Sequence, residues 1–129
     1  IHVGSVVLSK SQVEKIHEAI KNSLETRKSF LQKGYNLKQL SEDTCIPIHH
    51  LSAFINQFYS THFNHLINEY RVRHCEGKIR NGEWKSKTLE AIAEESGFNN
   101  RNTFTSSFKK VTGCNPSGFL QTVKQHQIA

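Results

Sequence analysis

The stretch TLEAIAEESGFNNRNTFTSSFKKVTG, residues 88–113, decides the fold. Thr88 and Asn100 are residue types that begin helices, and Gly97 and Gly113 are typical of positions where helices end. Apolar residues three or four apart give each helix one buried side: Leu89, Ile92 and Ala93 in the first, and Phe104, Phe108 and Val111 in the second. The pattern predicts a short helix, a tight turn and a second helix, which is the helix-turn-helix arrangement.

Residues 36–60 repeat this plan. Shifted by 52 positions, the first helices align as Leu37 with Leu89, Leu40 with Ile92, Ser41 with Ala93, Glu42 with Glu94 and Ile46 with Phe98. After one extra residue in the second turn, the second helices align as Leu51 with Phe104, Ser52 with Thr105, Ile55 with Phe108 and Ser60 with Gly113. The chain therefore contains two helix-turn-helix units.

Helical periodicity continues outside the two units, and strand-like alternation is nearly absent. A capping box of Ser11 and Glu14 predicts a helix over about 11–32 that ends before Gly34. Further helices are expected at 63–80 and from Pro116 to about Gln125. In the first unit, Leu51, Phe54, Ile55 and Phe58 are expected to be buried. We predict an all-α fold of about seven helices, in which a long linker helix joins two helix-turn-helix subdomains.

The expected organisation has five parts. They are an N-terminal linker and amphipathic helix (1–35), the first helix-turn-helix (36–60), the linker helix and loop (61–87), the second helix-turn-helix (88–113) and a C-terminal helix (114–129). The sequence has 129 residues, begins with Ile1 and contains no Met, so we expect the output domain of a longer regulator with an upstream sensor or dimerisation domain. The rival interpretation is a stand-alone regulator that lacks its first residues.

Composition excludes several classes of protein. Three cysteines, Cys45, Cys75 and Cys114, are odd in number and widely spaced, so no disulfide framework or zinc knuckle is expected. No apolar stretch approaches the ~20 residues of a membrane span, and no secretion leader opens the chain. We expect a cytoplasmic protein with no membrane contact.

Charge favours a polyanionic partner. Seventeen Lys and Arg against eleven Asp and Glu give a net charge of +6. No acidic residue occurs between Thr44 and Asn68 or after Ser96. A further basic run, Lys78, Arg80, Lys85 and Lys87, precedes the second unit.

The outward faces of the two second helices have the short polar side chains that contact base edges in the major groove. The predicted DNA-binding residues are His49, Ser52, Ala53 and Asn56 in the first unit, and Asn100, Arg101, Asn102, Thr105, Ser106 and Lys109 in the second. The 63–80 helix would span about 27 Å at 1.5 Å per residue. One DNA turn is about 34 Å, so both helices could enter successive major grooves on one face of double-stranded DNA.

The stretch LEAIAEESGFNNRNTFTSSFKKVTGCNPSGF (89–119) resembles the C-terminal domain of AraC/XylS-type transcription regulators. The matching motifs are Ile92-Ala93, Gly97-Phe98, Phe104, Phe108-Lys109-Lys110, Gly113 and Pro116-Ser117, and with Tyr70-Arg71 the resemblance covers about 36–120. It implies a bacterial, non-enzymatic regulator that binds double-stranded DNA without a cofactor, with RNA polymerase as a further expected partner. Departures concentrate in the first unit, where Ser41, Cys45, Pro47, Ala53 and Ser60 replace common Ala, Gly, Ser, Arg and Gly, while Leu120 replaces an Arg in the last helix.

Alternatives to these interpretations remain open. A helical adaptor that docks an acidic protein would also be basic, and an enzyme is a more distant alternative. His62 and His65 are three residues apart and could chelate weakly, but no metal site is expected because no Cys or carboxylate joins them at zinc spacing. We expect Cys75 to be buried and inert, and Trp84 to anchor a loop on the core. Arg101 could contact either a base or a phosphate.

Overall fold

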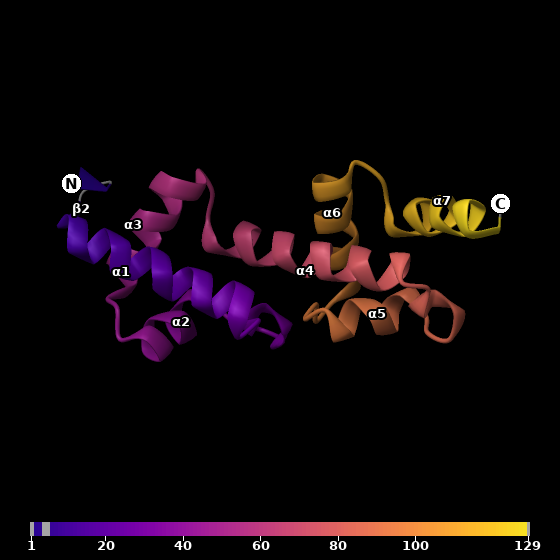
Figure 1. Cartoon of the computed structure of the whole chain (residues 1–129), viewed down its shortest axis with the longest axis horizontal. Helices are drawn as coiled ribbons and strands as arrows, with labels where there is room; N and C mark the ends of the chain where they lie inside the picture. The colour runs from indigo at the N-terminus through magenta and orange to yellow at the C-terminus, as the bar shows by residue number, and fades with distance from the viewer. Residues whose placement is uncertain (1, 4–5, 129) are drawn as a thin grey trace. The chain divides into compact units, whose positions relative to one another are not determined.

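The computed structural model describes residues 2–3 and 6–128. Two strands of two residues each, β1 (His2–Val3) and β2 (Val6–Val7), pair antiparallel. Within the described residues seven α-helices follow (Figure 1): α1 Lys10–Lys21, α2 Leu37–Thr44, α3 Ile48–Tyr59, α4 Phe63–Arg80, α5 Leu89–Glu95, α6 Arg101–Thr112 and α7 Pro116–Ile128. The predicted all-α class is confirmed, and α4 has the bounds expected for the long linker helix.

Side-chain caps begin α2, α5 and α6 where the sequence predicts them. The side chain of Asn36 accepts a hydrogen bond from the Gln39 amide at 2.9 Å, before α2. Thr88 caps α5 by accepting from the Ala91 amide at 3.0 Å. Such caps satisfy amide groups that have no partner inside the helix, which is why these polar residues determine where each helix begins.

The first helix differs from its prediction of one continuous helix over 11–32. It is capped one position before its start by Ser9, in a capping box with Gln12, rather than by Ser11 with Glu14. After α1 the chain forms one π-helical turn, Asn22–Thr26, and later a short 3₁₀ turn, Ser29–Leu31. Ser9 and Gln12 satisfy the same capping pattern as the predicted pair, so the motif alone did not choose between them.

The chain divides into two compact units. Unit 1 comprises Ile1–Ser29 and Tyr35–Ile67, and unit 2 comprises Phe30–Gly34 and Asn68–Ala129. The boundary between the later segments falls inside α4. The short segment 30–34 therefore belongs to unit 2, although unit 1 residues precede and follow it in the sequence.

Each unit has its own apolar core. In unit 1 the fully buried side chains include those of Leu8, Ile20, Leu24, Leu40, Leu51, Phe54, Ile55 and Ile67. In unit 2 the core cluster comprises Val72, Cys75, Ile79, Ile92, Ala93, Phe98, Phe104, Phe108, Phe119 and Val123. The prediction that Phe58 is buried is wrong: its side chain is 54% exposed. Phe58 lies in the last turn of α3, where its ring stacks over that of Phe54 at a centroid distance of 4.3 Å instead of entering the core.

Candidate nucleic-acid interface

Two helix-turn-helix units are present, α2 with α3 and α5 with α6, and their similarity extends to the backbone. Cys45 after α2 and Gly97 after α5 both have positive φ, 58° and 102°. Ser60 after α3 and Gly113 after α6 do as well, at 54° and 84°. The left-handed conformation ends each helix and redirects the chain, so the internal repeat found in the sequence is also a repeat of turn geometry.

A chain of aromatic rings holds α6 on the core of unit 2. The rings of Phe98 and Phe104 have centroids 5.3 Å apart, and Phe108 lies 5.8 Å from Phe104 and 5.3 Å from Phe119. Phe104 and Phe108 are buried. Because one side of α6 is fixed in this way, its opposite side is presented outward.

That outward side carries the residues predicted to contact DNA. The structure exposes every predicted residue of the second unit: Asn100, Arg101, Asn102, Thr105, Ser106 and Lys109. The Asn100 side chain also accepts a hydrogen bond from the Thr103 amide at 2.8 Å, so its oxygen caps α6. The side-chain NH₂ of Asn100 keeps its donor capacity.

The corresponding face of α3 is less exposed. His49 and Asn56 are exposed, whereas Ser52 and Ala53 are half-buried. No Lys or Arg occurs in α3. The four predicted residues thus lie on one helix, but their surface is less exposed than that of α6 and carries no Lys or Arg.

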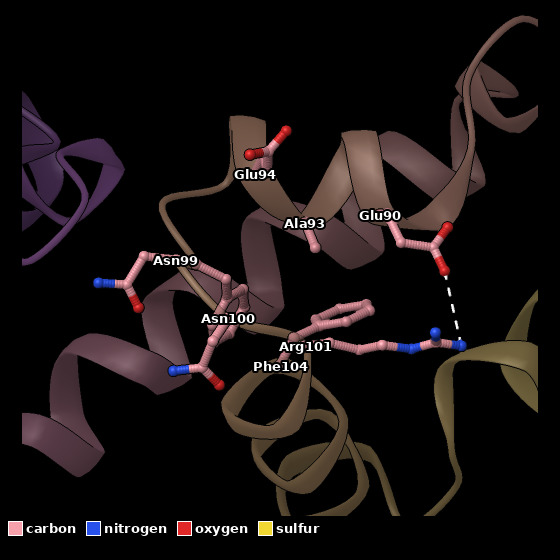
Figure 2. A pocket seen from close by; sticks show the side chains of 8 residues that line it. Glu90, Ala93, Glu94, Asn99, Asn100, Arg101 and Phe104 are labelled. Atoms are coloured by element: carbon pink, nitrogen blue, oxygen red, sulfur yellow. Dashed lines mark ion pairs between the residues drawn. The ribbon is translucent and has the colours of Figure 1, made fainter.

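A pocket of about 200 Å³ lies beside the first turn of α6, and Figure 2 shows its lining. Its lining residues are Glu90, Ala93 and Glu94 of α5, Phe98, Asn99 and Asn100 of the turn, and Arg101 and Phe104 of α6. The Arg101 guanidinium Nη2 lies 3.7 Å from Glu90 Oε1 (dashed in Figure 2). On the other side, Lys33 Nζ donates to Glu94 Oε1 at 2.8 Å.

Sequence reasoning missed this acidic neighbour of Arg101. The second recognition face has no acidic residue in sequence, but the packing of α5 on α6 places Glu90 against it. Glu90 and Arg101 are separated by a whole helix and turn, so no local periodicity signals their contact. Only the general packing of the two helices of a helix-turn-helix against each other could have indicated it.

Two lysines of the basic run before the second unit are engaged by carboxylates. Lys87 Nζ donates to Glu83 at 2.9 Å and to Glu95 at 2.9 Å. Lys78 Nζ donates to Glu83 at 3.2 Å. Hydrogen bonds from Lys87 and then Lys78 hold the pKa of Glu83 below its ordinary value, and hydrogen bonds to Glu95 and Glu83 raise the pKa of Lys87. These side chains form a local ion-pair network around the loop rather than a free cationic surface.

The remaining residues considered in the sequence are two histidines, a cysteine and the tryptophan. Cys75 is completely buried, and burial raises the pKa of its thiol to about 12. Trp84 packs against the core of unit 2, with Lys124 Nζ 5.1 Å from the ring centroid. The His62 and His65 rings lie 6.3 Å apart, and within residues 2–3 and 6–128 no three His, Cys, Asp or Glu side chains are grouped so that they could hold a metal ion.

Comparison with known proteins defines the class. The model of a helix-turn-helix domain family, of AraC type, matches residues 40–122. A solved structure of a Listeria innocua protein of unknown function is 27% identical, with a TM-score of 0.68, covering 80% of this chain and 95% of that one. The C-terminal domain of AraT, a response regulator from Geobacillus stearothermophilus, is 23% identical with a TM-score of 0.71, covering 91% of this chain and 88% of that one, and shows the same fold. No curated protein matches the chain significantly.

The chain therefore belongs to the AraC-type helix-turn-helix family, as its sequence motifs indicate. Its general function is DNA binding and transcription regulation, and the family is one of DNA-binding regulators rather than enzymes. Across the part of the chain that the structure describes, no helix combines the length and apolar character needed to cross a membrane.

Proposed function

We propose that α3 and α6 are the recognition helices, and that they enter successive major grooves on one face of a double-stranded DNA. The observation that carries the proposal is the outward side of α6, where five polar and basic side chains are all exposed opposite two buried phenylalanines: Arg101, Asn102, Thr105, Ser106 and Lys109. A helix of this kind fits the major groove, where each base pair presents its own pattern of donors and acceptors.

The chemistry of α6 suits base contact near its N-terminus and phosphate contact further along. Arg101 can donate two hydrogen bonds to guanine O6 and N7, and the Asn102 amide can pair with adenine N6 and N7. Lys109 suits a phosphate as a point charge.

The pairing with Glu90 does not prevent Arg101 from reaching DNA. Arg101 Nη2 and Glu90 Oε1 are 3.7 Å apart, and the two side chains are 80% and 60% exposed. Exposed pairs of this sort contribute roughly 0–1 kcal/mol, less than the roughly 1–3 kcal/mol discrimination of a bidentate Arg–guanine contact. Instead, the negative charge of Glu90 disfavours a DNA phosphate in the space beside Arg101.

The first recognition helix should contribute less to specificity. Asn56 can pair with adenine, and His49 and Ser52 can donate or accept one hydrogen bond each. Ala53 offers only apolar contact to a thymine methyl group. We therefore propose that α6 carries most of the sequence discrimination and α3 mainly sets register.

Two further partners are part of the proposal. As a transcription regulator bound upstream of a gene, the protein would contact RNA polymerase. A sensor or dimerisation domain joined before residue 1 would supply the signal. The basis for both partners is the regulatory class of the chain.

Selection of bound duplexes from a random library tests the function directly. We expect one selected sequence, for which an Arg101→Ala variant should lose about 1–3 kcal/mol of affinity if Arg101 contacts a base, and more than Asn56→Ala loses. Arg27→Ala, which removes an exposed arginine outside both helices, is the matched control. If Arg101 contacts a phosphate, all sequences should weaken together. A greater loss from Asn56→Ala would reverse the ranking, and the absence of any preferred sequence would favour an adaptor for an acidic protein.

A further inference from the structure

The second helix-turn-helix rests on a segment that comes from far earlier in the chain. Residues 30–34 belong to unit 2, although residues on both sides of them belong to unit 1. Phe30 is 4% exposed, and its ring lies 5.8 Å from those of Tyr70 and His74 on α4. The segment is therefore held against α4 through the buried ring of Phe30.

Arg71 fastens this segment to α4. It is 7% exposed, and its Nε donates to the Phe30 carbonyl oxygen at 2.8 Å. Its Nη2 donates to the Gln32 carbonyl oxygen at 3.1 Å, and its Nη1 to Asn68 Oδ1 at 3.0 Å. All three acceptors are neutral, so this buried guanidinium is satisfied by backbone and amide oxygens and not by a carboxylate.

The turn that leads into α6 packs directly on the same atoms. Gly97 is the left-handed residue of that turn, and a Cβ atom there would overlap the Phe30 carbonyl oxygen and lie 2.9 Å from Arg71 Nε. The neighbouring Ser96, also buried, has its hydroxyl 3.1 Å from His74 Nδ1. A third contact joins the segment to the pocket beside α6, because Lys33 pairs with Glu94, which lines that pocket.

We propose that Arg71 and the 30–34 segment are positioning elements for DNA binding: they fix the turn before α6 and thereby the placement of Arg101 and its neighbours in the groove. This inference rests on the proposed role of α6. The 30–34 segment lies outside both helix-turn-helix units, and Arg71 is buried. Together they would control how one of the two recognition helices contacts the bases.

The Arg71→Lys variant tests the proposal, because it keeps the charge and loses the planar set of donors. Its matched control is Arg73→Lys on the same helix, where the arginine is 58% exposed and pairs with Glu76 at 2.8 Å. Amide hydrogen exchange of the free protein supplies a readout that does not involve DNA. In Arg71→Lys we expect exchange at residues 96–104 to rise about tenfold or more, as loss of charged hydrogen bonds predicts, with α2 and α3 unchanged.

Binding to the selected duplex and to its single-base variants supplies the second readout. Arg71→Lys should lower affinity about tenfold, and the penalties for base changes should shrink only in the half of the site contacted by α6. Arg73→Lys should stay within about twofold of the unchanged protein, the range expected of an exposed pair. Should Arg71→Lys fail to fold, Phe30→Leu, which leaves Arg71 in place, is expected to show the same half-site pattern in weaker form.

The outcomes separate the two proposals. Unchanged exchange at 96–104, or a loss of affinity spread evenly over both halves of the site, would overturn the positioning role while leaving the recognition helices in place. A lack of base preference in the unchanged protein would instead refute the proposed function, whatever the two arginine variants show.

Discussion

Adding one methyl group at Gly97 should destabilise unit 2 far more than the same change at Gly113. Both glycines end helices with positive φ, 102° and 84°. An alanine Cβ at 113 would meet nothing within 4 Å, whereas at 97 it would overlap the Phe30 carbonyl oxygen. The pair therefore separates the conformational cost of a left-handed alanine from the cost of displacing the 30–34 segment.

The expected magnitudes follow from these contacts. A left-handed alanine costs about 1–2 kcal/mol, less about 0.4–1 kcal/mol regained because alanine restricts the unfolded chain. Gly113→Ala should thus cost roughly 1 kcal/mol. At Gly97 the carbonyl must also move away from Arg71 Nε, which loses a hydrogen bond to a charged donor worth about 1.5–3 kcal/mol. Gly97→Ala should therefore cost about 2–4 kcal/mol.

Urea unfolding followed by tryptophan fluorescence measures this difference in the right unit. Trp84 is the single tryptophan and packs on the core of unit 2, while circular dichroism reports both units. The fluorescence transition should shift strongly in Gly97→Ala and modestly in Gly113→Ala. Equal free energies of unfolding for the two variants would show that the Phe30 carbonyl yields freely, and would refute the reasoning.

Three further expectations concern other parts of the molecule. Phe54→Ala should cost about 3–5 kcal/mol in free energy of unfolding because the ring is fully buried, while Phe58→Ala, at 54% exposure, should cost less than half as much; equal costs in denaturant titrations would contradict this. Cys75 is completely buried and burial raises the pKa of its thiol to about 12, so maleimide at pH 8 should label the exposed Cys45 first; early labelling of Cys75, detected by mass spectrometry of peptides, would contradict this. Specific DNA binding should weaken with a log–log salt slope of about −4 to −7, for about five to eight phosphate contacts, and a slope near −1 in a salt titration would be incompatible with the proposed interface.

Local signals explain how much of this fold the sequence predicts. Asn36, Thr88 and Asn100 act as caps because their side chains bond amides only three residues away, so the motif and the structure are the same short segment. The apolar faces of α5 and α6 are predicted for a similar reason, since burial follows helical periodicity. The periodicity of α3 fails at Phe58, where the helix ends and its last turn has no core to enter.

Contacts between distant segments leave no such signal. The sequence predicts the exposed residues of α6, yet it does not indicate that Glu90 faces Arg101. Nor does any motif mark residues 30–34 as part of the second unit, because the two hydrogen bonds that they accept from Arg71 use backbone carbonyls, which every residue has. Gly97 is matched by Cys45 in the first unit, and the difference acquires a physical reason only when the Phe30 carbonyl is seen to occupy the space of a side chain.

The path of the chain through residues 30–34 decides where this protein can be shortened. A fragment cut at the start of the family match, residue 40, would lose the first turn of α2 but retain the second helix-turn-helix in full. It would nevertheless lack the buried Phe30 ring and the Phe30 and Gln32 carbonyl oxygens, which are two of the three acceptors of Arg71. Losing a hydrogen bond of a charged donor costs about 1.5–3 kcal/mol, and losing the burial of a Phe side chain costs about 1.5–3 kcal/mol more. A gene fragment intended to yield a stable second unit must therefore begin before Phe30, well upstream of the motif that identifies it.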